Sequence, residues 1–442
     1  MQSKVALHTI GCKLNFSETS TIGNQFLKKG FQVVEFNEKA DVYVFNTCSV
    51  TENAEKECRQ LVRRALRQNP EAFIIVTGCY AQLRPEEISQ IEGVDAILGS
   101  NEKFKLFSLL EDFNKKDLTC IYVSPTQQLN EFGAAHSTDA DSRTRAFFKI
   151  QDGCDYKCSF CTIPLARGSS RSMNTIELIS EFNKLISSGY KEVILTGVNV
   201  GDYGKAYSTN LFNVLKKMIE VPGEFRIRIS SIEPNLLSDE IIELTAESEK
   251  LCNHFHIPLQ SGSTNILKAM QRRYTVSDYS KLIYKIKNRI PDACIGVDVI
   301  VGFPGETEEE FLKTYKFLNE LPISYLHVFT YSERPDTKAI TFNGSVDIQI
   351  RKRRNNMLRI LSEKKRQAFY TEMIGKNLEV LFESENDNGN MKGFTSNYVR
   401  VSHTYDENYV NQFSDITISE VRENICIGKL KGTKKSIELI AC

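Results

Sequence analysis

Three closely spaced cysteines, Cys154, Cys158 and Cys161, constrain this chain more than any other feature of its sequence. They form a CxxxCxxC pattern just past a short apolar run, residues 146–150, that is typical of a buried strand. Three thiolates on one loop can hold three irons of a 4Fe-4S cluster and leave the fourth iron open to a small chelating ligand. A structural zinc ion usually takes four protein ligands in two paired sets, and no second pair lies nearby in the sequence. The pattern therefore favours a cluster over zinc or three buried cysteines.

A second set of cysteines is spread along the first eighty residues but shares one structural position. Cys12, Cys48 and Cys79 each lie one to three residues beyond a predicted strand. The strands in question are residues 4–10, 41–45 and 73–77. Because the carboxyl ends of parallel strands meet at one edge of an open α/β sheet, these thiolates are expected to converge there. The alternative is that small apolar residues merely end the strands.

The remaining six cysteines show no such convergence: Cys58, Cys120, Cys252, Cys294, Cys426 and Cys442. We interpret them as small buried hydrophobic residues. Disulfides are disfavoured in the cytoplasm, so in a cytoplasmic chain twelve cysteines are better explained by metal binding or redox chemistry. No apolar run approaches the ~18 residues needed to span a bilayer, and the first residues lack the pattern of a signal peptide. We therefore expect a cytoplasmic localisation without membrane contact.

The coarse pattern along the chain predicts three regions in an α/β protein. Residues 1–130 alternate strands with helices, at 17–29 and 53–68, and are expected to form an open α/β sheet domain carrying the second cysteine set. Residues 127–145 are polar and weakly periodic, which is typical of a linker. Residues 140–372 contain six further strand-like runs, which predict a partial (β/α)6 barrel. These runs are 146–150, 192–195, 226–230, 254–259, 295–301 and 325–330.

Helical segments separate the six strand-like runs, at 174–188, 238–247, 277–289 and 307–319. Thr307 and Glu310 have the spacing of a capping box at the start of the last helix. A long basic helix is expected over 347–370. Residues 373–442 then change to short strands, at 378–382, 398–402, 415–419 and 436–440, separated by turns such as 386–390. This pattern predicts a small C-terminal β-barrel.

The cysteine loop on the first strand of a six-unit partial barrel resembles the radical S-adenosylmethionine superfamily. The whole chain resembles the methylthiotransferases of that superfamily. The matching segments are GCKLN (11–15), NTC (46–48), TGC (77–79), GCDYKCSFC (153–161), TIPLARG (162–168), HIPLQSG (256–262) and MQRRY (270–274). Within this family the MtaB branch is the most similar one on two segments. They are GCKLN, where other members have GCQMN-type starts, and TGVNVGDYG (196–204). Leu165 stands where the family pattern has Tyr, a departure that does not involve the expected ligands.

The resemblance implies a transferase that adds a methylthio group to C2 of N6-threonylcarbamoyladenosine at position 37 of tRNA. It implies two 4Fe-4S clusters and S-adenosylmethionine as cofactors. The cluster on the CxxxCxxC loop would bind S-adenosylmethionine and generate a 5′-deoxyadenosyl radical, which abstracts hydrogen from C2. The cluster on Cys12, Cys48 and Cys79 would carry the sulfur, methylated by a second S-adenosylmethionine. The C-terminal strands resemble the family's TRAM barrel, and an electron donor such as a flavodoxin or ferredoxin is implied.

Further contacts to the cofactor are expected at the carboxyl ends of the barrel strands, where such sites lie. Arg272 is a candidate partner for an anionic group, and Phe160 is a candidate for backbone contacts to adenine. The other candidates are Thr196, Gly197, Asn199, Glu233 and Gln260. Each polar residue among them is equally compatible with an ordinary strand end or helix cap. No residue beyond the cluster ligands is assigned a catalytic role.

Local basic patches bear on the expected partner, because Lys+Arg and Asp+Glu balance at 56 each and leave no global field. Four basic residues recur at helical spacing in the second helix: Lys56, Arg59, Arg63 and Arg67. Residues 351–376 carry nine Lys or Arg against two Glu, and Lys429, Lys431, Lys434 and Lys435 form a third cluster. Such runs are commonly solvated faces. In this setting they favour contact with the phosphates of a tRNA anticodon stem-loop.

Several alternatives remain at this point. A methylthiotransferase could act on N6-isopentenyladenosine of tRNA or on a ribosomal protein side chain instead. A protein that binds RNA with iron–sulfur or zinc sites and has no enzymatic activity is the third possibility.

Overall fold

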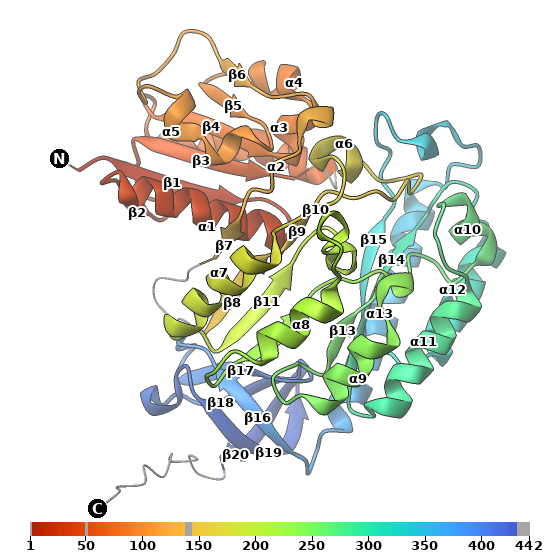
Figure 1. The fold of residues 1–442 in the computed structure, drawn as a ribbon. Helices are drawn as coiled ribbons and strands as arrows, with labels where there is room; N and C mark the ends of the chain where they lie inside the picture. The colour runs from red at the N-terminus through yellow and green to blue at the C-terminus, as the bar shows by residue number, and fades with distance from the viewer. Residues whose placement is uncertain (1, 49–51, 138–143, 431–442) are drawn as a thin grey trace, which may run out of the picture.

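The computed structural model describes residues 2–48, 52–137 and 144–430. Figure 1 shows three layers of the chain stacked along one direction, with the N-terminal sheet at the top, a curved sheet with its helices in the middle and a small barrel at the bottom. Helix α1 (Lys13–Lys28) and the short helix α6 (Ile163–Arg167) lie where the first two layers meet. The predicted fold class is confirmed in all three parts.

The N-terminal sheet has six strands in the order β2-β1-β3-β4-β5-β6, and all neighbouring strands pair in parallel. The predicted strands appear as β1 (Lys4–Thr9), β3 (Val42–Thr47) and β4 (Phe73–Gly78), side by side at the centre. Three short strands outside the central three were not predicted: β2 (Gln32–Val34) and β6 (Cys120–Tyr122) at the two edges and β5 (Ala96–Leu98) between β4 and β6. Every residue of β3 and β4 is buried, as expected for central parallel strands covered on both faces.

Helices cover both faces of this sheet. They are α1 (Lys13–Lys28), α2 (Glu52–Gln68), α3 (Cys79–Leu83), α4 (Pro85–Ser89) and α5 (Leu106–Leu109), with single turns at Glu102–Phe104 and Thr126–Gln128. Alternate residues of β3 enter different apolar clusters, Tyr43 and Phe45 in one and Val42 and Val44 in the other. A strand buried on both faces reads as one continuous apolar run, which is why the sequence reveals it clearly.

The middle layer contains the six predicted strands in parallel. They are β8 (Arg145–Lys149), β11 (Glu192–Thr196), β12 (Arg226–Ile229), β13 (His254–His256), β14 (Cys294–Val301) and β15 (Tyr325–Thr330). Ladders join β12-β11-β8 and β13-β14-β15, and single bridges such as Ser231 to His256 connect the two groups. The result is an open barrel, as the sequence predicted. Two-residue strands β9 (Gln151–Asp152) and β10 (Arg171–Ser172) pair beside it.

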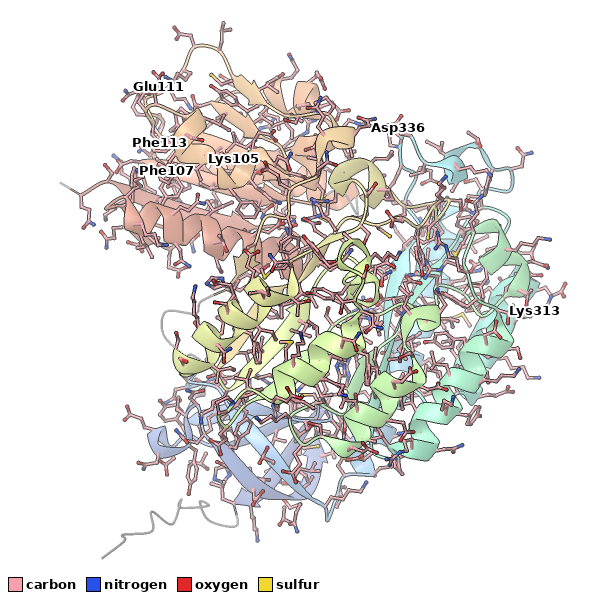
Figure 2. All side chains as sticks on the ribbon, viewed as in Figure 1. Lys105, Phe107, Glu111, Phe113, Lys313 and Asp336 are labelled. Carbon is pink, nitrogen blue, oxygen red and sulfur yellow. The ribbon has the colours of Figure 1, made fainter. Side chains whose placement is uncertain are left out.

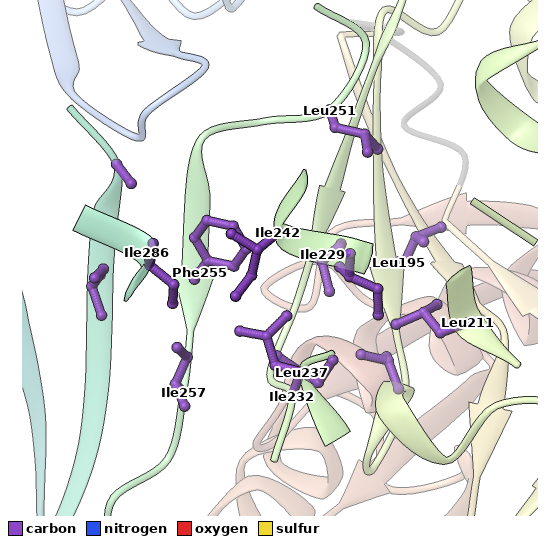
Figure 3. Packing of buried hydrophobic residues seen from close by; sticks show 14 of the residues in the cluster. Leu195, Leu211, Ile229, Ile232, Leu237, Ile242, Leu251, Phe255, Ile257 and Ile286 are labelled. Atoms are coloured by element: carbon purple, nitrogen blue, oxygen red, sulfur yellow. The ribbon is translucent and has the colours of Figure 1, made fainter. Parts of the chain in front are cut away.

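Helices pack on the outer face of the barrel strands and bury a large apolar core, part of which Figure 3 shows. They are α7 (Thr175–Ser187), α8 (Leu211–Ile219), α9 (Asp239–Glu247), α10 (Thr264–Ala269), α11 (Val276–Arg289) and α12 (Glu308–Glu320). Single turns lie at Val200–Asp202, Lys205–Tyr207, Pro234–Leu236 and Lys338–Thr341. Leu195, Ile229 and Phe255, from three strands, point into this core. The alternate residues of the same strands therefore face the inside of the barrel.

Two local predictions need correction. The stretch 127–145 is not a plain linker, because β7 (Ala135–His136) pairs antiparallel with β8 at the edge of the barrel sheet. Thr307 does cap α12 by accepting the Glu310 N–H at 3.3 Å, but the Glu310 side chain bonds Ser263 and Asn265 instead of returning to the cap. The reciprocal half of the capping box is therefore missing, because those side chains compete for the carboxylate.

The long predicted helix is α13 (Ile348–Thr371), which packs against β15 and leads into the C-terminal barrel. That barrel closes as β16-β17-β18-β20-β19. Its strands are β16 (Asn377–Phe382), β17 (Asn390–Thr395), β18 (Arg400–Thr404), β19 (Phe413–Arg422) and β20 (Ile425–Leu430), with one turn at Glu407–Tyr409. Strands β17 and β20 were not predicted, and the expected strand at 436–440 lies outside the described residues.

Candidate functional site

Cys12, Cys48 and Cys79 lie at one edge of the N-terminal sheet. Cys12 precedes α1, Cys48 directly follows β3, and Cys79 is the first residue of α3 after β4. Because β1, β3 and β4 are neighbours in a parallel sheet, their carboxyl ends bring the three cysteines together. Cys12 is exposed to solvent, but the protein atoms packed around it still raise the pKa of its thiol, and the nearby Arg167 guanidinium opposes that rise.

The backbone around these cysteines is tightly packed. A Cβ on Gly11 would lie 2.7 Å from Cys48 Cβ, and one on Gly78 would lie 2.3 Å from the Thr47 carbonyl oxygen. Gly78 also has φ of 97°, a conformation that favours glycine. The Asn15 side chain joins two strand ends by donating to the Ile10 and Thr47 carbonyls, each at 3.0 Å. These contacts hold the three cysteine-bearing loops in fixed positions.

Cys154, Cys158 and Cys161 lie on the loop between β9 and α6, at the carboxyl end of the first barrel strand. The Cys154 N–H donates to the Gly168 carbonyl at 3.0 Å, and the Cys161 N–H donates to the Cys158 carbonyl at 3.1 Å. Burial raises the pKa of Cys154 and Cys161 to about 12. The free thiols are therefore protonated at neutral pH, and metal binding here would release protons.

The spacing of the sulfurs is relevant to what each triad can hold. Around a single zinc ion, Zn–S bonds of about 2.3 Å place thiolate sulfurs roughly 3.8 Å apart. Across 2–48, 52–137 and 144–430, one group of three potential ligands has its atoms within 4.8 Å of one another, and it is His256, Asp298 and His327. Neither cysteine triad is that tight. A single zinc ion would therefore require the sulfurs of either triad to move closer together.

A buried arginine contacts each cysteine set. Arg167, the last residue of α6, donates from Nε to Cys79 Sγ at 3.2 Å. Arg272 donates from Nη1 to Cys158 Sγ at 3.0 Å and also pairs with Glu233. Hydrogen bonds to ligand sulfurs adjust the reduction potential of iron–sulfur clusters. Each arginine is placed to do this if a cluster occupies its site.

Arg167 belongs to a charge network buried between the N-terminal sheet and the barrel. Glu18 accepts from Lys103 at 2.6 Å, from Lys149 at 2.8 Å and from Arg167 at 3.0 Å. Asp152 pairs with Lys149, Arg167 and Arg171. Burial alone would raise the pKa of Glu18, but the three cations lower it well below its ordinary value. The network has four cations and two carboxylates, and this excess of positive charge suits anionic thiolates beside it.

The predicted cofactor contacts gather around the end of the barrel that carries the cysteine loop. Among the described residues, the buried Thr196 Oγ1, Asn199 Oδ1 and Nδ2, and Gln260 Oε1 have no hydrogen-bond partner. Buried polar atoms are normally satisfied, so this set is complementary to a polar ligand such as S-adenosylmethionine. A Cβ on Gly197 would lie 2.9 Å from Gln151 Oε1, so the backbone passes close to that side chain. These unpaired polar groups therefore fit S-adenosylmethionine, the cofactor that the resemblance implies.

The remaining two candidates differ in their surroundings. Phe160 is partly buried against Phe303, with ring centroids 6.5 Å apart, in a small apolar cluster. Glu233 pairs with Arg272, whose Nε also donates to the Tyr274 hydroxyl at 3.0 Å. Arg272 was predicted as a partner for an anionic group of the cofactor. Its present partners are a carboxylate and a cysteine sulfur.

Sequence reasoning missed the residues that connect the two cysteine sets. Glu18 and Lys103 are far apart in the chain and carried no motif. Arg167 lies inside the TIPLARG segment, so its proximity to the cysteine loop was the one available signal. Gln151 was also missed: its Oε1 accepts the Asn199 N–H at 2.8 Å and its Nε2 donates to the Gly153 carbonyl at 2.8 Å. It links the cysteine loop to the next barrel strand.

The basic patches differ in availability. Lys56, Arg59, Arg63 and Arg67 are exposed on α2, and Arg59 lies within 3.4 Å of the Tyr80 hydroxyl, next to Cys79. On α13, by contrast, Arg351 pairs with Glu333 and Arg354 pairs with Glu306, both largely buried. Much of the charge on α13 therefore joins the helix to the barrel. Lys429 is exposed, whereas Lys431, Lys434 and Lys435 lie outside the described residues.

The other cysteines belong to neither triad, although Cys58 is in the same buried apolar cluster as Cys48. Cys58, Cys252, Cys294 and Cys426 are buried, as expected for small apolar residues, and Cys120 is partly buried. Cys442 lies outside the described residues. A search of the described helices found none with the length and apolar character needed to cross a membrane.

Two family models match the chain. Residues 4–99 match the model described as Uncharacterized protein family UPF0004, and residues 148–318 match the Radical SAM superfamily. The first match covers the sheet that carries Cys12, Cys48 and Cys79. The second covers the cysteine loop and most of the barrel strands.

Characterised relatives match over nearly the whole chain. The threonylcarbamoyladenosine tRNA methylthiotransferase MtaB of Bacillus subtilis (strain 168) is 40% identical, covering 94% of this chain and 93% of the relative. The MtaB of Aquifex aeolicus (strain VF5) is 39% identical, covering 90% and 96%. The tRNA-2-methylthio-N(6)-dimethylallyladenosine synthase of Clostridium botulinum (strain Hall) is 34% identical, covering 93% of each.

Two solved structures share the fold at low sequence identity. The radical S-adenosylmethionine methyltransferase TsrM from Kitasatospora setae superposes with a TM-score of 0.55 at 15% identity, covering 77% of each chain. The cobalamin-dependent S-adenosylmethionine radical enzyme OxsB gives a TM-score of 0.51 at 11% identity, covering 84% of this chain and 57% of that one. These likenesses support the arrangement of the sheet and the barrel.

Proposed function

The chain belongs to the radical S-adenosylmethionine methylthiotransferases, and we propose that it adds a methylthio group to C2 of N6-threonylcarbamoyladenosine at position 37 of tRNA. One observation carries most weight. One buried charge network borders both cysteine triads: Arg167 contacts Cys79 of one triad, and the carbonyl of the next residue, Gly168, accepts the N–H of Cys154 in the other. An enzyme that activates a carbon and then delivers sulfur to it needs two such sites close together.

The cofactors supply the difficult chemistry when bound: S-adenosylmethionine at one 4Fe-4S cluster provides a carbon radical, and the second cluster provides the sulfur. We assign the first cluster to Cys154, Cys158 and Cys161, and the second to Cys12, Cys48 and Cys79. The protein positions them. The unpaired polar atoms of Thr196, Asn199 and Gln260 are suited to bind the methionine and ribose groups of the cofactor.

A buried arginine borders each of these sites. Arg272 and Glu233 form a pair of which Arg272 is almost wholly buried, and it contacts the Cys158 sulfur. Arg167 is likewise buried and contacts the Cys79 sulfur of the other triad. Both guanidiniums hold positive charge against sulfur in a place where water is scarce, which favours the bound anionic thiolates.

The substrate is a tRNA, and we propose that its anticodon stem-loop enters from the side of α2. The exposed basic face of Lys56, Arg59, Arg63 and Arg67 flanks Cys79 and suits the phosphates of an RNA stem. The closed C-terminal barrel, which we interpret as a TRAM domain, is a second RNA-binding element. We assign residues 1–130, 140–372 and 373–442 to the three domains. The enzyme would act in the cytoplasm with an electron from a flavodoxin or ferredoxin.

The nucleoside profile of tRNA tests the substrate. A strain lacking the gene should lose 2-methylthio-N6-threonylcarbamoyladenosine and accumulate its precursor without the methylthio group. Restoring the gene should restore the modified nucleoside. Loss of the isopentenyl-derived methylthio nucleoside instead would contradict the substrate, and a methylthio gain on a ribosomal protein would contradict RNA as the acceptor.

Iron and sulfide analysis after anaerobic reconstitution tests the clusters. The wild-type chain should bind close to eight irons, and Ala replacing Cys154, Cys158 and Cys161 should leave about four. Ala replacing Cys12, Cys48 and Cys79 should also leave about four. A matched control replaces Cys120, Cys252 and Cys426, one from each part of the fold, and should keep the full content. Loss of all iron from either triad variant, with the fold intact, would contradict two independent sites.

A further inference from the structure

The inner face of the barrel strands carries paired arginines near the ends where β8, β11 and β12 begin. Arg145, Glu192 and Arg226 are aligned across these three strands. Glu192 accepts from Arg226 Nε at 2.6 Å and from Arg228 Nε at 2.9 Å. All three of these ionic side chains are at most 2% exposed. One carboxylate thus serves two buried guanidiniums, which leaves one positive charge without a counterion.

A second carboxylate beside this group is shared in the same way. Glu383 pairs with Arg145 and with Arg400 Nη1, the latter at 2.6 Å. Both guanidiniums also lie over the Phe394 ring, at 4.9 and 4.4 Å from its centroid. Four guanidiniums therefore share two carboxylates, and two positive charges remain unbalanced at this end of the inner face.

Lys13 adds a third. It is the first residue of α1, directly after Cys12, and its side chain is exposed, with Nζ 5.9 Å from the centroid of the Phe147 ring. Phe147 is aligned with Ile194 and, through it, with Arg228. Over the part of the chain that the structure describes, no carboxylate lies within 4.0 Å of the Lys13 ammonium group. Asp298, farther round the inner face on β14, is hydrogen-bonded to His256 at 2.7 Å instead.

An exposed, unpaired ammonium group above two uncompensated guanidinium charges forms a site for an anion. The site adjoins the triad of Cys12, Cys48 and Cys79, because Lys13 directly follows Cys12 in the chain. An adenine whose C2 approaches the Cys12, Cys48 and Cys79 triad would present its N6 substituent to the neighbouring inner face. A threonylcarbamoyl substituent carries one carboxylate, whereas a dimethylallyl substituent carries no charge.

We propose that Lys13, with the charge of Arg228 behind it, binds the carboxylate of the N6-threonylcarbamoyl group and so selects this nucleoside over one with an apolar N6 substituent. The inference rests on the proposed function, since it names the group by which the same site recognises its substrate. A backbone phosphate of the RNA shares the anionic chemistry and is the other possible ligand. The experiment separates the two.

The test compares two synthetic anticodon stem-loops that differ in one group. One carries N6-threonylcarbamoyladenosine at position 37, and the other carries the same nucleoside with the threonine carboxylate converted to a neutral methylamide. Binding to the reconstituted enzyme is measured by fluorescence anisotropy at fixed salt, and methylthio transfer by mass spectrometry. A charge-assisted hydrogen bond to the carboxylate should make wild type bind the first RNA about tenfold more tightly or better.

Lys13→Met should abolish most of this preference by weakening the carboxylate RNA about tenfold while leaving the methylamide RNA within about twofold of wild type. Lys13→Arg should keep the preference, because it retains the charge. Lys313→Met removes an exposed lysine at the outer edge of the barrel helices, on α12, and should change neither affinity (Figure 2). Iron and sulfide content should match wild type in every variant, and Lys13→Gln replaces Lys13→Met if the latter lowers it.

Equal weakening of both RNAs by Lys13→Met would overturn the assignment and indicate a phosphate contact. An unchanged preference in that variant would overturn it as well, because Lys13 would then bind no part of the substrate. In both cases the wild-type enzyme would still methylthiolate the carboxylate RNA, so the proposed function would stand. If wild type transferred no methylthio group to either RNA, the proposed function would fail and this inference with it.

Discussion

Glu18→Gln is the most informative single substitution for the buried charge network. The change is nearly isosteric, but it removes the carboxylate that Lys103, Lys149 and Arg167 share and turns one of its two acceptor oxygens into an NH2 group that can only donate. Each of these three cations is at most 2% exposed. Asp152 would then be the one carboxylate left in the network for four cations, Arg171 included.

The expected magnitude follows from burial. Breaking a buried ion pair by removing one partner typically costs about 3–5 kcal/mol, because the other charge stays in a low-dielectric environment without compensation. Here the lost carboxylate is completely buried and is contacted by three cations, so we expect the upper part of that range for the free energy of unfolding. A second substitution, Lys103→Met, should recover part of the loss, since it removes the cation whose pKa burial already lowers to about 8.

Urea denaturation followed by far-ultraviolet circular dichroism measures this effect, because the chain has no tryptophan to serve as a fluorescence probe. The m-value grows with the surface exposed on unfolding, so for a chain of 442 residues a loss of about 4–5 kcal/mol should lower the urea midpoint of Glu18→Gln by a few tenths of a molar or more. Glu111→Gln is the control, since Glu111 lies exposed at the outer tip of the N-terminal layer (Figure 2). If Glu18→Gln shifted the midpoint as little as Glu111→Gln, the network would not stabilise the fold as argued.

Three further predictions use the same sites. Burial lowers the pKa of Lys103 to about 8, so between pH 8 and 10.5 the unfolded chain binds more protons than the folded chain. The free energy of unfolding of the wild type, measured by urea titration and compared with that of Lys103→Met, should therefore rise by on the order of 3 kcal/mol over this interval. Arg167→Lys keeps the charge but removes the Nε–H bond to Cys79. It should lower the midpoint potential of the adjacent cluster by about 20–60 mV, measured by a redox titration followed by electron paramagnetic resonance. An unchanged potential would contradict a role for this hydrogen bond. Gly78→Ala should cost more than the roughly 1 kcal/mol expected for Gly30→Ala, because both have positive φ but at Gly78 a Cβ would also meet the Thr47 carbonyl; equal melting temperatures would exclude that clash.

Much of the fold followed from apolar periodicity. The central strands β1, β3 and β4 and all six barrel strands were predicted to within a few residues, because buried parallel strands such as β3 and β4 are rich in apolar residues. Short edge strands escaped, and β2 shows why: two of its three residues are exposed, so no apolar run distinguishes it from a loop. Strand β7 has two residues and forms because β8 offers it an edge, which no local pattern encodes.

The charged residues show the opposite balance. The run of Arg and Lys on α13 suggested an RNA-binding surface, yet Arg351 and Arg354 are buried in ion pairs with Glu333 and Glu306. Composition records charge but not its partners. The same limit concealed Arg167, whose contacts with Glu18 and Cys79 span 149 and 88 residues of the chain.

The sequence by itself determined which thiolates are available and which ends of strands they occupy, since CxxxCxxC spacing is local and strand-end positions follow from parallel topology. Only the tertiary structure decided what surrounds them: a shared Glu18 between three cations, an arginine against one sulfur of each triad, and an unpaired Lys13 beside Cys12. The physical reason is range. Apolar periodicity repeats every few residues, whereas burial and charge pairing depend on which distant segments the fold brings into contact.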